Sequence, residues 1–354
     1  MKTVQRKGNS YRIPSKLNEF QEELYLHLIN WKRVQITTDS GKSGDITYDA
    51  ILPDSYAADG QMPHIYPPIK GRLEAHREKN PFRIHRFFYH MASSQVANIN
   101  LFLPILDHPL ADQILASVKP DFASLDKSEL DNGYCFEYWG GNFHSQAGSG
   151  PLRDKSAMAG TDADLAIAYR DREGKRCIWL IEHKLTECDF TTCGGFRSKG
   201  RQSHHDCSKS FSAILANKSS CYYHDAKEFS YWVLSEEHQS FFPNHSKHER
   251  CPFQGGMNQL WRNQLLGLAI EDDAHSPFSL STFSVVKHPD NSSLDATIEA
   301  YKDLIAGNPG FSVMTSADLL EAAEKTGDGA LSNWAEWYRG LYRIDRMTGR
   351  IRLV

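Results

Sequence analysis

The sequence predicts an α/β protein in which a strand-rich centre lies between helical ends. Three central segments, residues 134–139, 162–169 and 176–184, are apolar and bounded by turn-forming residues, as strands are. Segments near both ends instead repeat apolar residues at helical spacing. The 354 residues are 40% apolar and 24% charged, which is ordinary for a globular protein with a buried core. This order of elements favours an α/β or α+β architecture.

Helical periodicity is clearest near the N-terminus. Within residues 15–31, an apolar stripe falls on one face of a helix; its members are Leu17, Phe20, Leu24, Leu28 and Trp31. Residues 37–80 are rich in Gly, Pro and Asp and are expected to be irregular. A second helix is expected within residues 83–106.

The second half of the chain mixes both periodicities. Further strands are expected at residues 229–234 and 278–286, and helices at 258–270, 316–325 and 331–342. We therefore divide the chain into an N-terminal helical region packed on the core (1–130), the core itself (131–290) with a Cys/His-containing insertion (188–228), and a C-terminal helical region (291–354).

Charge and hydropathy exclude several classes of protein. No run of 18 apolar residues could span a membrane, and residues 1–15 lack the apolar stretch of a secretory signal. With seven cysteines and no such signal, we expect a cytoplasmic protein with reduced thiols. The net charge of −4 means that any nucleic-acid contact must be a local patch. Protease, serine-hydrolase and dinucleotide motifs are absent.

Charged residues gather at one end of a predicted hairpin. Residues 162–169 and 176–184 are joined by a polar turn, and a hairpin symmetric about Glu173 pairs residues whose numbers sum to 346. Asp164 then lies opposite Glu182, and Asp162 opposite Lys184. A bulge would break this register. If it holds, all four side chains share one face at the same end of the sheet.

The rest of both faces is apolar, as in strands at the centre of a sheet. The charged face continues with Ala166, Ala168, Ile178 and Leu180, and the other carries Leu165, Ile167, Trp179 and Ile181. Adjacent carboxylates at the end of a buried sheet repel each other and need compensation. Oxygen ligands of this kind suit Mg²⁺ or Mn²⁺, and a lysine beside the ion can orient and help to deprotonate a water.

Context distinguishes this site from chance matches. The tripeptide (D/E)-x-K also occurs at Glu173-Gly-Lys175 and Asp225-Ala-Lys227, but neither ends an apolar strand. The alternative interpretation of the hairpin is a cross-strand salt bridge that Lys184 makes with Asp162 or Asp164.

These residues resemble the PD-(D/E)xK nuclease superfamily, most strongly over residues 134–269. Gly160-Thr-Asp-Ala-Asp164 is similar to the motif that supplies the metal-binding aspartate, with Ala163 in place of the proline. Ile181-Glu-His-Lys184 is similar to the second motif. The resemblance implies a restriction-endonuclease-like fold, a central mixed β-sheet flanked by helices with helical extensions at both ends. It further implies Asp164 and Glu182 as metal ligands and Lys184 as catalytic lysine.

The resemblance also implies an activity and additional residues. The expected protein is a Mg²⁺- or Mn²⁺-dependent endonuclease that cleaves DNA in a restriction or defence setting, with RNA left open. Members often carry an upstream acid, here Glu137, and a glutamine on a later helix, here Gln259; Asp162 is a further candidate. Enzymes that cut both strands often pair two sites by symmetry, so a homodimer is one expectation. The alternative is a catalytically weak nucleic-acid-binding protein on the same fold.

Basic residues suggest where a nucleic acid would bind. Arg83 and Arg86 lie in a basic and aromatic stretch, and Arg197, Lys199 and Arg201 form a second basic loop. Arg262 shares a helix face with Gln259 and suits a phosphate contact. The alternative for each is an ordinary solvated surface.

The insertion after the core contains four cysteines. Cys188, Cys193, Cys207 and Cys221 are separated by 4, 13 and 13 residues, which matches no compact zinc pattern. Free thiols in a flexible insertion are expected here, and a zinc or iron–sulfur site is the open alternative.

Overall fold

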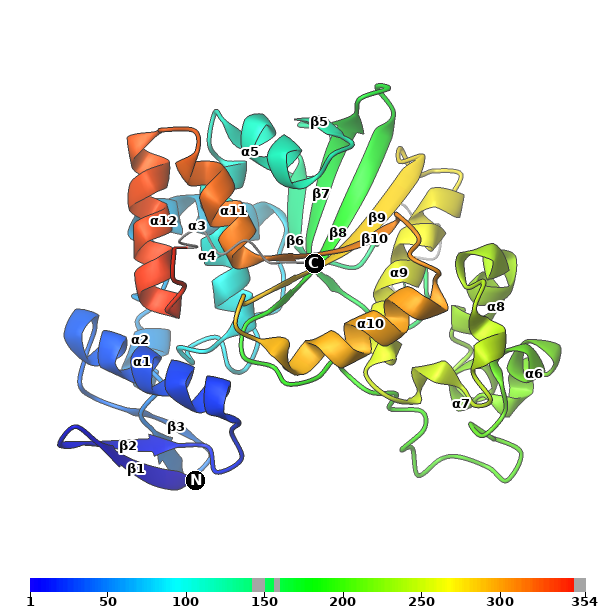
Figure 1. Cartoon of the computed structure of the whole chain (residues 1–354), viewed down its shortest axis with the longest axis horizontal. Coiled ribbons are helices and arrows are strands. Elements are labelled where there is room, and N and C mark those ends of the chain that lie inside the picture. Colours follow the sequence, from blue (N-terminus) through cyan, green and yellow to red (C-terminus); the bar gives the residue numbers. More distant parts are fainter. Residues whose placement is uncertain (142–149, 156–159, 347–354) are drawn as a thin grey trace, which may run out of the picture.

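The computed structural model describes residues 1–141, 150–155 and 160–346 and contains a mixed central sheet flanked by helices (Figure 1). The strand order is β10-β9-β8-β7-β5, and β6 also pairs with β7. The strands are β5 (Phe122–Leu125), β6 (Tyr134–Tyr138), β7 (Ala163–Asp171), β8 (Arg176–Lys184), β9 (Leu280–Lys287) and β10 (Phe311–Thr315). Pairs β8–β9 and β9–β10 are parallel and the others antiparallel, so the predicted fold class is confirmed.

The β7–β8 hairpin has the predicted register. Six pairs, from Leu165↔Ile181 to Arg170↔Arg176, are symmetric about Glu173. The predicted faces are also confirmed. Leu165, Ile167, Trp179 and Ile181 belong to one core cluster, and Ala166, Ala168, Ile178 and Leu180 to another on the opposite side of the sheet.

Each face of the sheet is covered by its own set of helices (Figure 1). The first core cluster joins the sheet to α4 (Ser94–Leu106), α5 (Ala111–Val118), α11 (Ser316–Glu324) and α12 (Gly329–Tyr342). The second joins it to α9 (Met257–Asp272) and α10 (Asp295–Leu304). Helix α9 lies close to β9 at Gly267. Any larger residue there would place its Cβ 2.6 Å from Ser281 Oγ, so this close approach requires glycine. This contact fixes the helix over the sheet.

The N-terminal part contains more regular structure than the sequence predicts. Its elements are β1 (Lys2–Arg6), β2 (Asn9–Ile13), α1 (Glu19–Gln35), β3 (Gly41–Ser43), β4 (Ile46–Tyr48), α2 (Asp54–Ala58) and α3 (Lys70–Lys79). The predicted irregularity of residues 37–80 is therefore wrong for four short elements. Helix α1 begins later than residue 15 because the Asn18 side chain caps it in a reciprocal capping box with Gln21.

The insertion between β8 and α9 is helical. It contains α6 (Phe211–Ala216), α7 (Tyr222–Asp225) and α8 (Tyr231–Glu237). The predicted strand at residues 229–234 is wrong, because Tyr231, Leu234 and Ser235 are buried at helical spacing and Ser235 Oγ donates to Tyr231 O. A short apolar run does not by itself distinguish a strand from a buried helix.

Several short elements complete the described structure. Single 3₁₀ turns occupy Pro67–Ile69, Lys218–Ser220, Gln239–Phe241, His245–Lys247, Pro252–Gln254 and Ser292–Leu294. Strands β5 and β10 lie outside residues 131–290, so the sheet also uses chain that the sequence assigned to the terminal regions. The domain boundaries themselves stay a prediction. Among the described helices, none combines the length and the apolar character needed to cross a bilayer.

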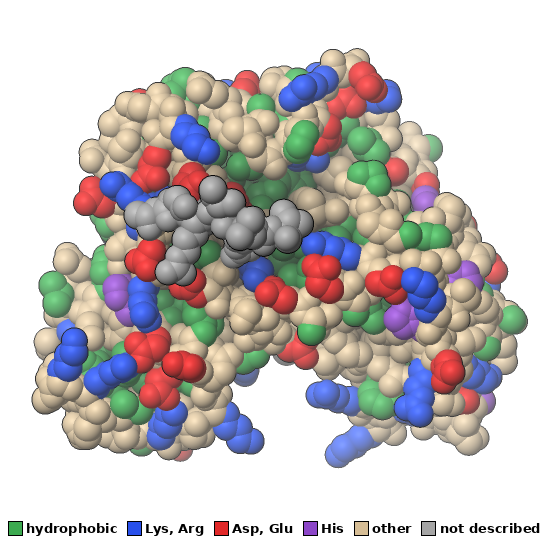
Figure 2. All heavy atoms as spheres, viewed as in Figure 1, with side chains coloured by type: hydrophobic (Ala, Val, Ile, Leu, Met, Phe, Trp, Pro, Cys, Tyr) green, Lys and Arg blue, Asp and Glu red, His purple; other side chains and the backbone are tan. Residues whose placement is uncertain are grey.

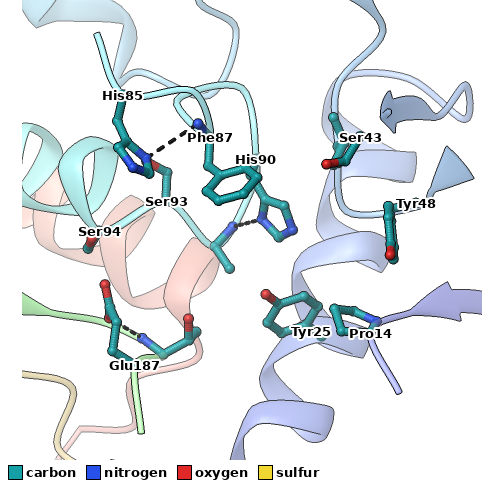
Figure 3. A pocket seen from close by; sticks show the side chains of 13 residues that line it. Pro14, Tyr25, Ser43, Tyr48, His85, Phe87, His90, Ser93, Ser94 and Glu187 are labelled. Carbon is teal, nitrogen blue, oxygen red and sulfur yellow. Dashed lines mark hydrogen bonds between the residues drawn. The ribbon is translucent and has the colours of Figure 1, made fainter. Parts of the chain in front are cut away.

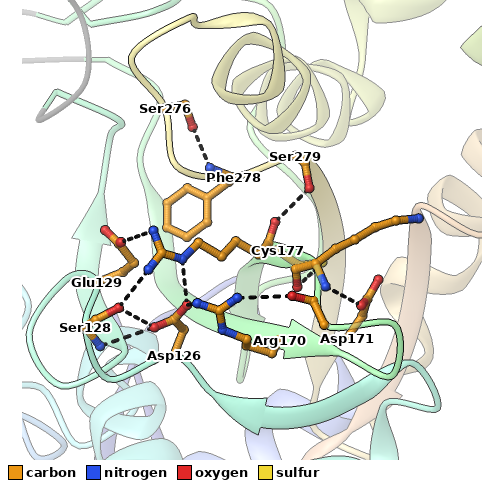
Figure 4. A network of polar contacts seen from close by, with 12 residues as sticks. Asp126, Ser128, Glu129, Arg170, Asp171, Cys177, Ser276, Phe278 and Ser279 are labelled. Carbon is orange, nitrogen blue, oxygen red and sulfur yellow. Dashed lines mark hydrogen bonds and ion pairs between the residues drawn. The ribbon is translucent and has the colours of Figure 1, made fainter.

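A polar network holds the turn end of the hairpin (Figure 4). The Asp126 carboxylate, which follows β5, lies 3.0 Å from Arg170 Nη2 and 3.1 Å from Arg176 Nε. Arg176 Nη1 also lies 3.1 Å from Glu129 Oε1. These ion pairs fix the turn end of β7 and β8. They therefore help to set the register of the two strands, which determines how the residues at the acidic end align.

Truncating the centre of this hairpin should destabilise the whole protein. Ile167 is fully buried, so Ile167→Ala should lower the free energy of unfolding by about 2–5 kcal/mol through lost burial and an unfilled cavity. Urea denaturation followed by circular dichroism measures this loss. Val34→Ala is the control, because Val34 is 77% exposed and its truncation should be nearly neutral. Equal effects of the two variants would contradict the placement of β7 in the core.

Candidate active site

The acidic end of the hairpin begins where the β7–β8 ladder stops. The last regular pair is Leu165↔Ile181, and Asp164 is the next residue of β7. Its Oδ2 accepts a hydrogen bond of 2.7 Å from the backbone N of His183. The half-buried Asp164 carboxylate is therefore tied to β8, next to Glu182 in the chain.

Glu182 is held by three side chains. It is only 3% exposed. Its Oε1 accepts from Gln259 Nε2 at 2.6 Å and lies 2.8 Å from Lys184 Nζ, and its Oε2 accepts from Asn263 Nδ2 at 2.7 Å. Gln259 and Asn263 are one turn apart on α9, and Gln259 Oε1 accepts from Thr191 N at 2.9 Å. The carboxylate is thus pre-oriented from the strand, the helix and the insertion.

Glu137 adds a third carboxylate from β6. The pairs Phe136↔Leu165 and Tyr138↔Ala163 flank it, so it occupies the position opposite Asp164. Its φ of 51° is rare for a non-glycine residue and interrupts the strand's alternation. Phe136 packs in the core cluster beneath α4, whereas Tyr138 packs in the cluster beneath α9. Such backbone strain concentrates at functional sites.

Burial and neighbouring charges shift the pKa values of Asp164, Glu137 and Lys184. Burial, and then the charges of Glu182 and Glu137, raise the pKa of Asp164 well above its ordinary value. Burial, reinforced by Asp162 and Glu182 and opposed by a hydrogen bond from Gln95, raises the pKa of Glu137 to about 7. Burial alone would lower the pKa of Lys184, but Glu182, Glu187 and Asp164 outweigh it and raise that pKa, so the lysine is an ammonium.

This charge distribution fits a divalent cation. Three carboxylates face one ammonium, which leaves two uncompensated negative charges when all are ionised. All the donors are hard oxygens, as Mg²⁺ requires. Among the described residues these three carboxylates do not bring their oxygens within 4.8 Å of one another. Mg²⁺ does not need such a cage, since it usually keeps several waters and binds one or two carboxylates.

The structure brings together Asp164, Glu182, Lys184, Glu137 and Gln259. Asp162 takes a different place, because its carboxylate forms an ion pair with Lys155 rather than facing Lys184. The predicted pairing of Asp162 with Lys184 is therefore wrong, and so is the alternative salt bridge between these two residues.

Of the six basic residues predicted to contact a nucleic acid, two bond within the protein and four are exposed. Arg262 Nη1 donates to Thr161 Oγ1 at 3.2 Å and lies 4.0 Å from Asp154 Oδ2, so it is partly engaged within the protein. Arg201 donates to two backbone carbonyls of its own loop. The other four predicted contact residues, Arg83, Arg86, Arg197 and Lys199, have exposed side chains.

A cavity of about 330 Å³ lies between the N-terminal part of the protein and the loop that follows β8 (Figure 3), and its lining includes none of Glu137, Asp164 and Glu182. Its labelled residues include His85, Phe87 and His90 on one side and Tyr25 on the other, with Glu187 at its edge. Glu187 Oε2 accepts from the backbone N of Leu185 at 2.9 Å, which folds the loop after β8. Glu187 thus lies in that loop and still contributes to the field at Lys184.

Three further residues contribute to the site and were not predicted from the sequence. Asn263 and Thr191 position Glu182 directly or through Gln259, and Gln95 of α4 bonds Glu137. Asn263 had a usable signal, because it lies four residues after Gln259 on an otherwise apolar helix. Thr191 lies in an irregular loop and Gln95 on a helix far along the chain, so neither carries a comparable local signal.

Comparison with known proteins identifies a family. A family model described as "Restriction Endonuclease associating with ARP" matches residues 38–343. The match includes every strand of the central sheet and all five residues that meet at the acidic site. No curated protein and no solved structure matches the chain.

The raised pKa of Glu137 predicts a pH-dependent cost in stability. Since the folded-state pKa of about 7 exceeds the ordinary 4.5, the metal-free protein should lose stability as the pH rises from about 5 to 8. Glu137→Gln should remove the part of this loss that Glu137 causes and gain about 2 kcal/mol relative to wild type over that range, allowing for partial exposure, whereas the part caused by Asp164 should persist. Denaturation in EDTA at both pH values measures it, with the exposed Glu237→Gln as control. Identical pH profiles for wild type and Glu137→Gln would refute this assignment.

Proposed function

Because the chain belongs to the family of restriction endonucleases associating with ARP, we propose that it is a metal-dependent nuclease that hydrolyses phosphodiester bonds in DNA. The observation that carries the proposal is the meeting of Asp164, Glu182 and Lys184 at the ends of two adjacent buried strands. Their chemistry is that of phosphodiester hydrolysis, in which charge must be stabilised and a water positioned.

Asp164 and Glu182 would hold the ion, with Mg²⁺ or Mn²⁺ matching their oxygen donors. When bound, such an ion lowers the pKa of a coordinated water and neutralises charge on phosphoryl oxygens. The protein contributes orientation. Gln259 and Asn263 fix both oxygens of Glu182, while the His183 amide fixes one oxygen of Asp164.

Lys184 supplies the positive charge of the site. Its ammonium already lies 2.8 Å from Glu182 Oε1, so it needs little reorganisation to orient a water or to stabilise negative charge that develops on the phosphate. Glu137 is a supporting acid: a carboxyl whose pKa is about 7 exchanges a proton readily near neutral pH.

The surface offers a path for a nucleic acid. Figure 2 shows the molecule hollowed at its lower edge, between the part that contains α1 and β1–β3 and the part that contains α6 and α7, with Lys and Arg side chains on both rims. Exposed Arg197 and Lys199 belong to the insertion loop. We assign Arg83, Arg86, Arg197, Lys199, Arg201 and Arg262 to phosphate contacts. Phosphate contacts position the nucleic acid and do not read its sequence.

The biological setting rests on the family. Its description supports a restriction-type or defence-type endonuclease that acts on DNA, and it names ARP as an associate. Association with such a partner, pairing of two copies for double-strand cleavage and action in the cytoplasm are parts of the same proposal.

Removal of Lys184 should abolish cleavage. Lys184→Ala should reduce Mg²⁺-dependent cleavage of supercoiled plasmid by about 100-fold or more, because it deletes the charge that stabilises the transition state. Lys175→Ala is a matched control, since Lys175 ends an identical E-x-K tripeptide in the exposed hairpin turn. EDTA should stop the wild type. Plasmid cleavage unaffected by Lys184→Ala would rule out the nuclease mechanism, and binding without any cleavage by the wild type would favour a catalytically weak DNA-binding protein.

Metal binding can be tested without turnover. Asp164→Asn should weaken Mn²⁺ binding, measured by calorimetry, by more than about tenfold, since it replaces a charged ligand by a neutral one. Asp162→Asn should leave Mn²⁺ affinity nearly unchanged, because Asp162 is paired with Lys155. Equal affinities for wild type and Asp164→Asn would exclude Asp164 as a ligand.

A further inference from the structure

Four cysteines of the insertion are gathered by its backbone. Cys251 N donates to Cys207 O at 3.4 Å, and Asp206 N donates to Ser220 O at 2.9 Å, which places Cys207 beside Cys221. Cys193 N donates to Gln254 O at 3.2 Å, which brings Cys193 to the turn that begins at Cys251. Each of these four thiols lies within electrostatic range of the other three.

Cys188 is not one of them. It is exposed, and its Sγ lies 3.9 Å from Asn18 Nδ2, on the N-terminal part of the protein. The four cysteines considered from the sequence included Cys188 and did not include Cys251. The corrected set has 13, 13 and 29 intervening residues, so only the tertiary structure reveals it.

Backbone amides point at two of the sulfurs. Phe196 N donates to Cys193 Sγ at 3.4 Å, and the Gly195 amide also lowers the pKa of this thiol. The Phe253 amide likewise acts to lower the pKa of the Cys251 thiol. Amide donors two and three residues after a cysteine stabilise a thiolate, which is the form that binds metals. As free thiols they are protonated, since burial raises the pKa of Cys193 to about 11 and that of Cys251 well above its ordinary value.

The distances between the four cysteine sulfurs distinguish a single zinc ion from an iron–sulfur cluster. In the described residues, no three of these sulfurs lie within 4.8 Å of one another. A single zinc ion with Zn–S bonds of about 2.3 Å would hold four sulfurs only about 4 Å apart. An iron–sulfur cluster is larger and separates its four cysteine ligands further. The wider spacing therefore matches a cluster better than a single ion.

We propose that Cys193, Cys207, Cys221 and Cys251 bind an iron–sulfur cluster. Such a cluster would pin three loops of the insertion to one another. One of these loops carries Thr191, whose amide holds Gln259 and through it Glu182. The cluster would thus support the acidic site structurally, from outside it.

A second cluster of possible metal ligands in the insertion is already satisfied by hydrogen bonds. The ligand atoms of His204, His205 and Asp225 lie within 4.8 Å of one another. However, Gln202 N donates to His205 Nδ1 at 2.7 Å, so the proton of this ring is on Nε2, which donates to Asp225 at 3.0 Å. Hydrogen bonds satisfy this group as it stands, and it serves as a control.

The test is the metal content of the full chain purified without oxygen. Wild type and Cys188→Ser should both contain iron and acid-labile sulfide and show visible charge-transfer absorbance. Cys207→Ser and Cys251→Ser should lose the cluster. His204→Ala should retain it.

Several outcomes would overturn the proposal. These are a wild type with neither iron nor sulfide, zinc in place of both, or an equal loss of cluster in Cys188→Ser. Retention of the metal by Cys251→Ser together with its loss from His204→Ala would move the site to the histidines. If the serine variants do not fold, the iron and sulfide content of the wild type decides by itself, and none of these readouts depends on nuclease activity.

Discussion

The structure of the site depends on one electrostatic constraint: carboxylates are held at the end of a strand pair that is otherwise buried and apolar. The sheet fixes Asp164 and Glu182, and its packing on α9 keeps Gln259 and Asn263 against Glu182. Water cannot screen these charges fully, so burial and the neighbouring carboxylates raise the pKa of Asp164 and of Glu137. Lys184 compensates only part of the charge, which leaves the site suited to a divalent cation.

The sequence predicts the centre of this arrangement well, because strict alternation determines which side chains share a face. The register about Glu173, both faces of the hairpin and the helix that carries Gln259 are all confirmed. Two features that strand alternation does not determine were not predicted correctly. Phe229–Leu234 contains a short apolar run that either periodicity fits, and the left-handed φ of Glu137 leaves no local trace in the sequence.

Contacts outside the strand pattern are the other limit on prediction from the sequence. Asp162 satisfies alternation yet pairs with Lys155, a partner from the preceding loop. Cys251 lies far along the chain from Cys193 but reaches it through the turn at Gln254. In neither case does strand alternation determine the partner. Spacing along the chain alone therefore gave the wrong partner for Asp162 and did not group Cys251 with Cys193.

The central claim is that Asp164 and Glu182 share one hard cation. Anomalous diffraction from crystals grown with Mn²⁺ tests it most directly. The account predicts a peak about 2 Å from a carboxylate oxygen of each residue. A peak at His204, His205 and Asp225 alone, or no peak near the ends of β7 and β8 at saturating Mn²⁺, would contradict it.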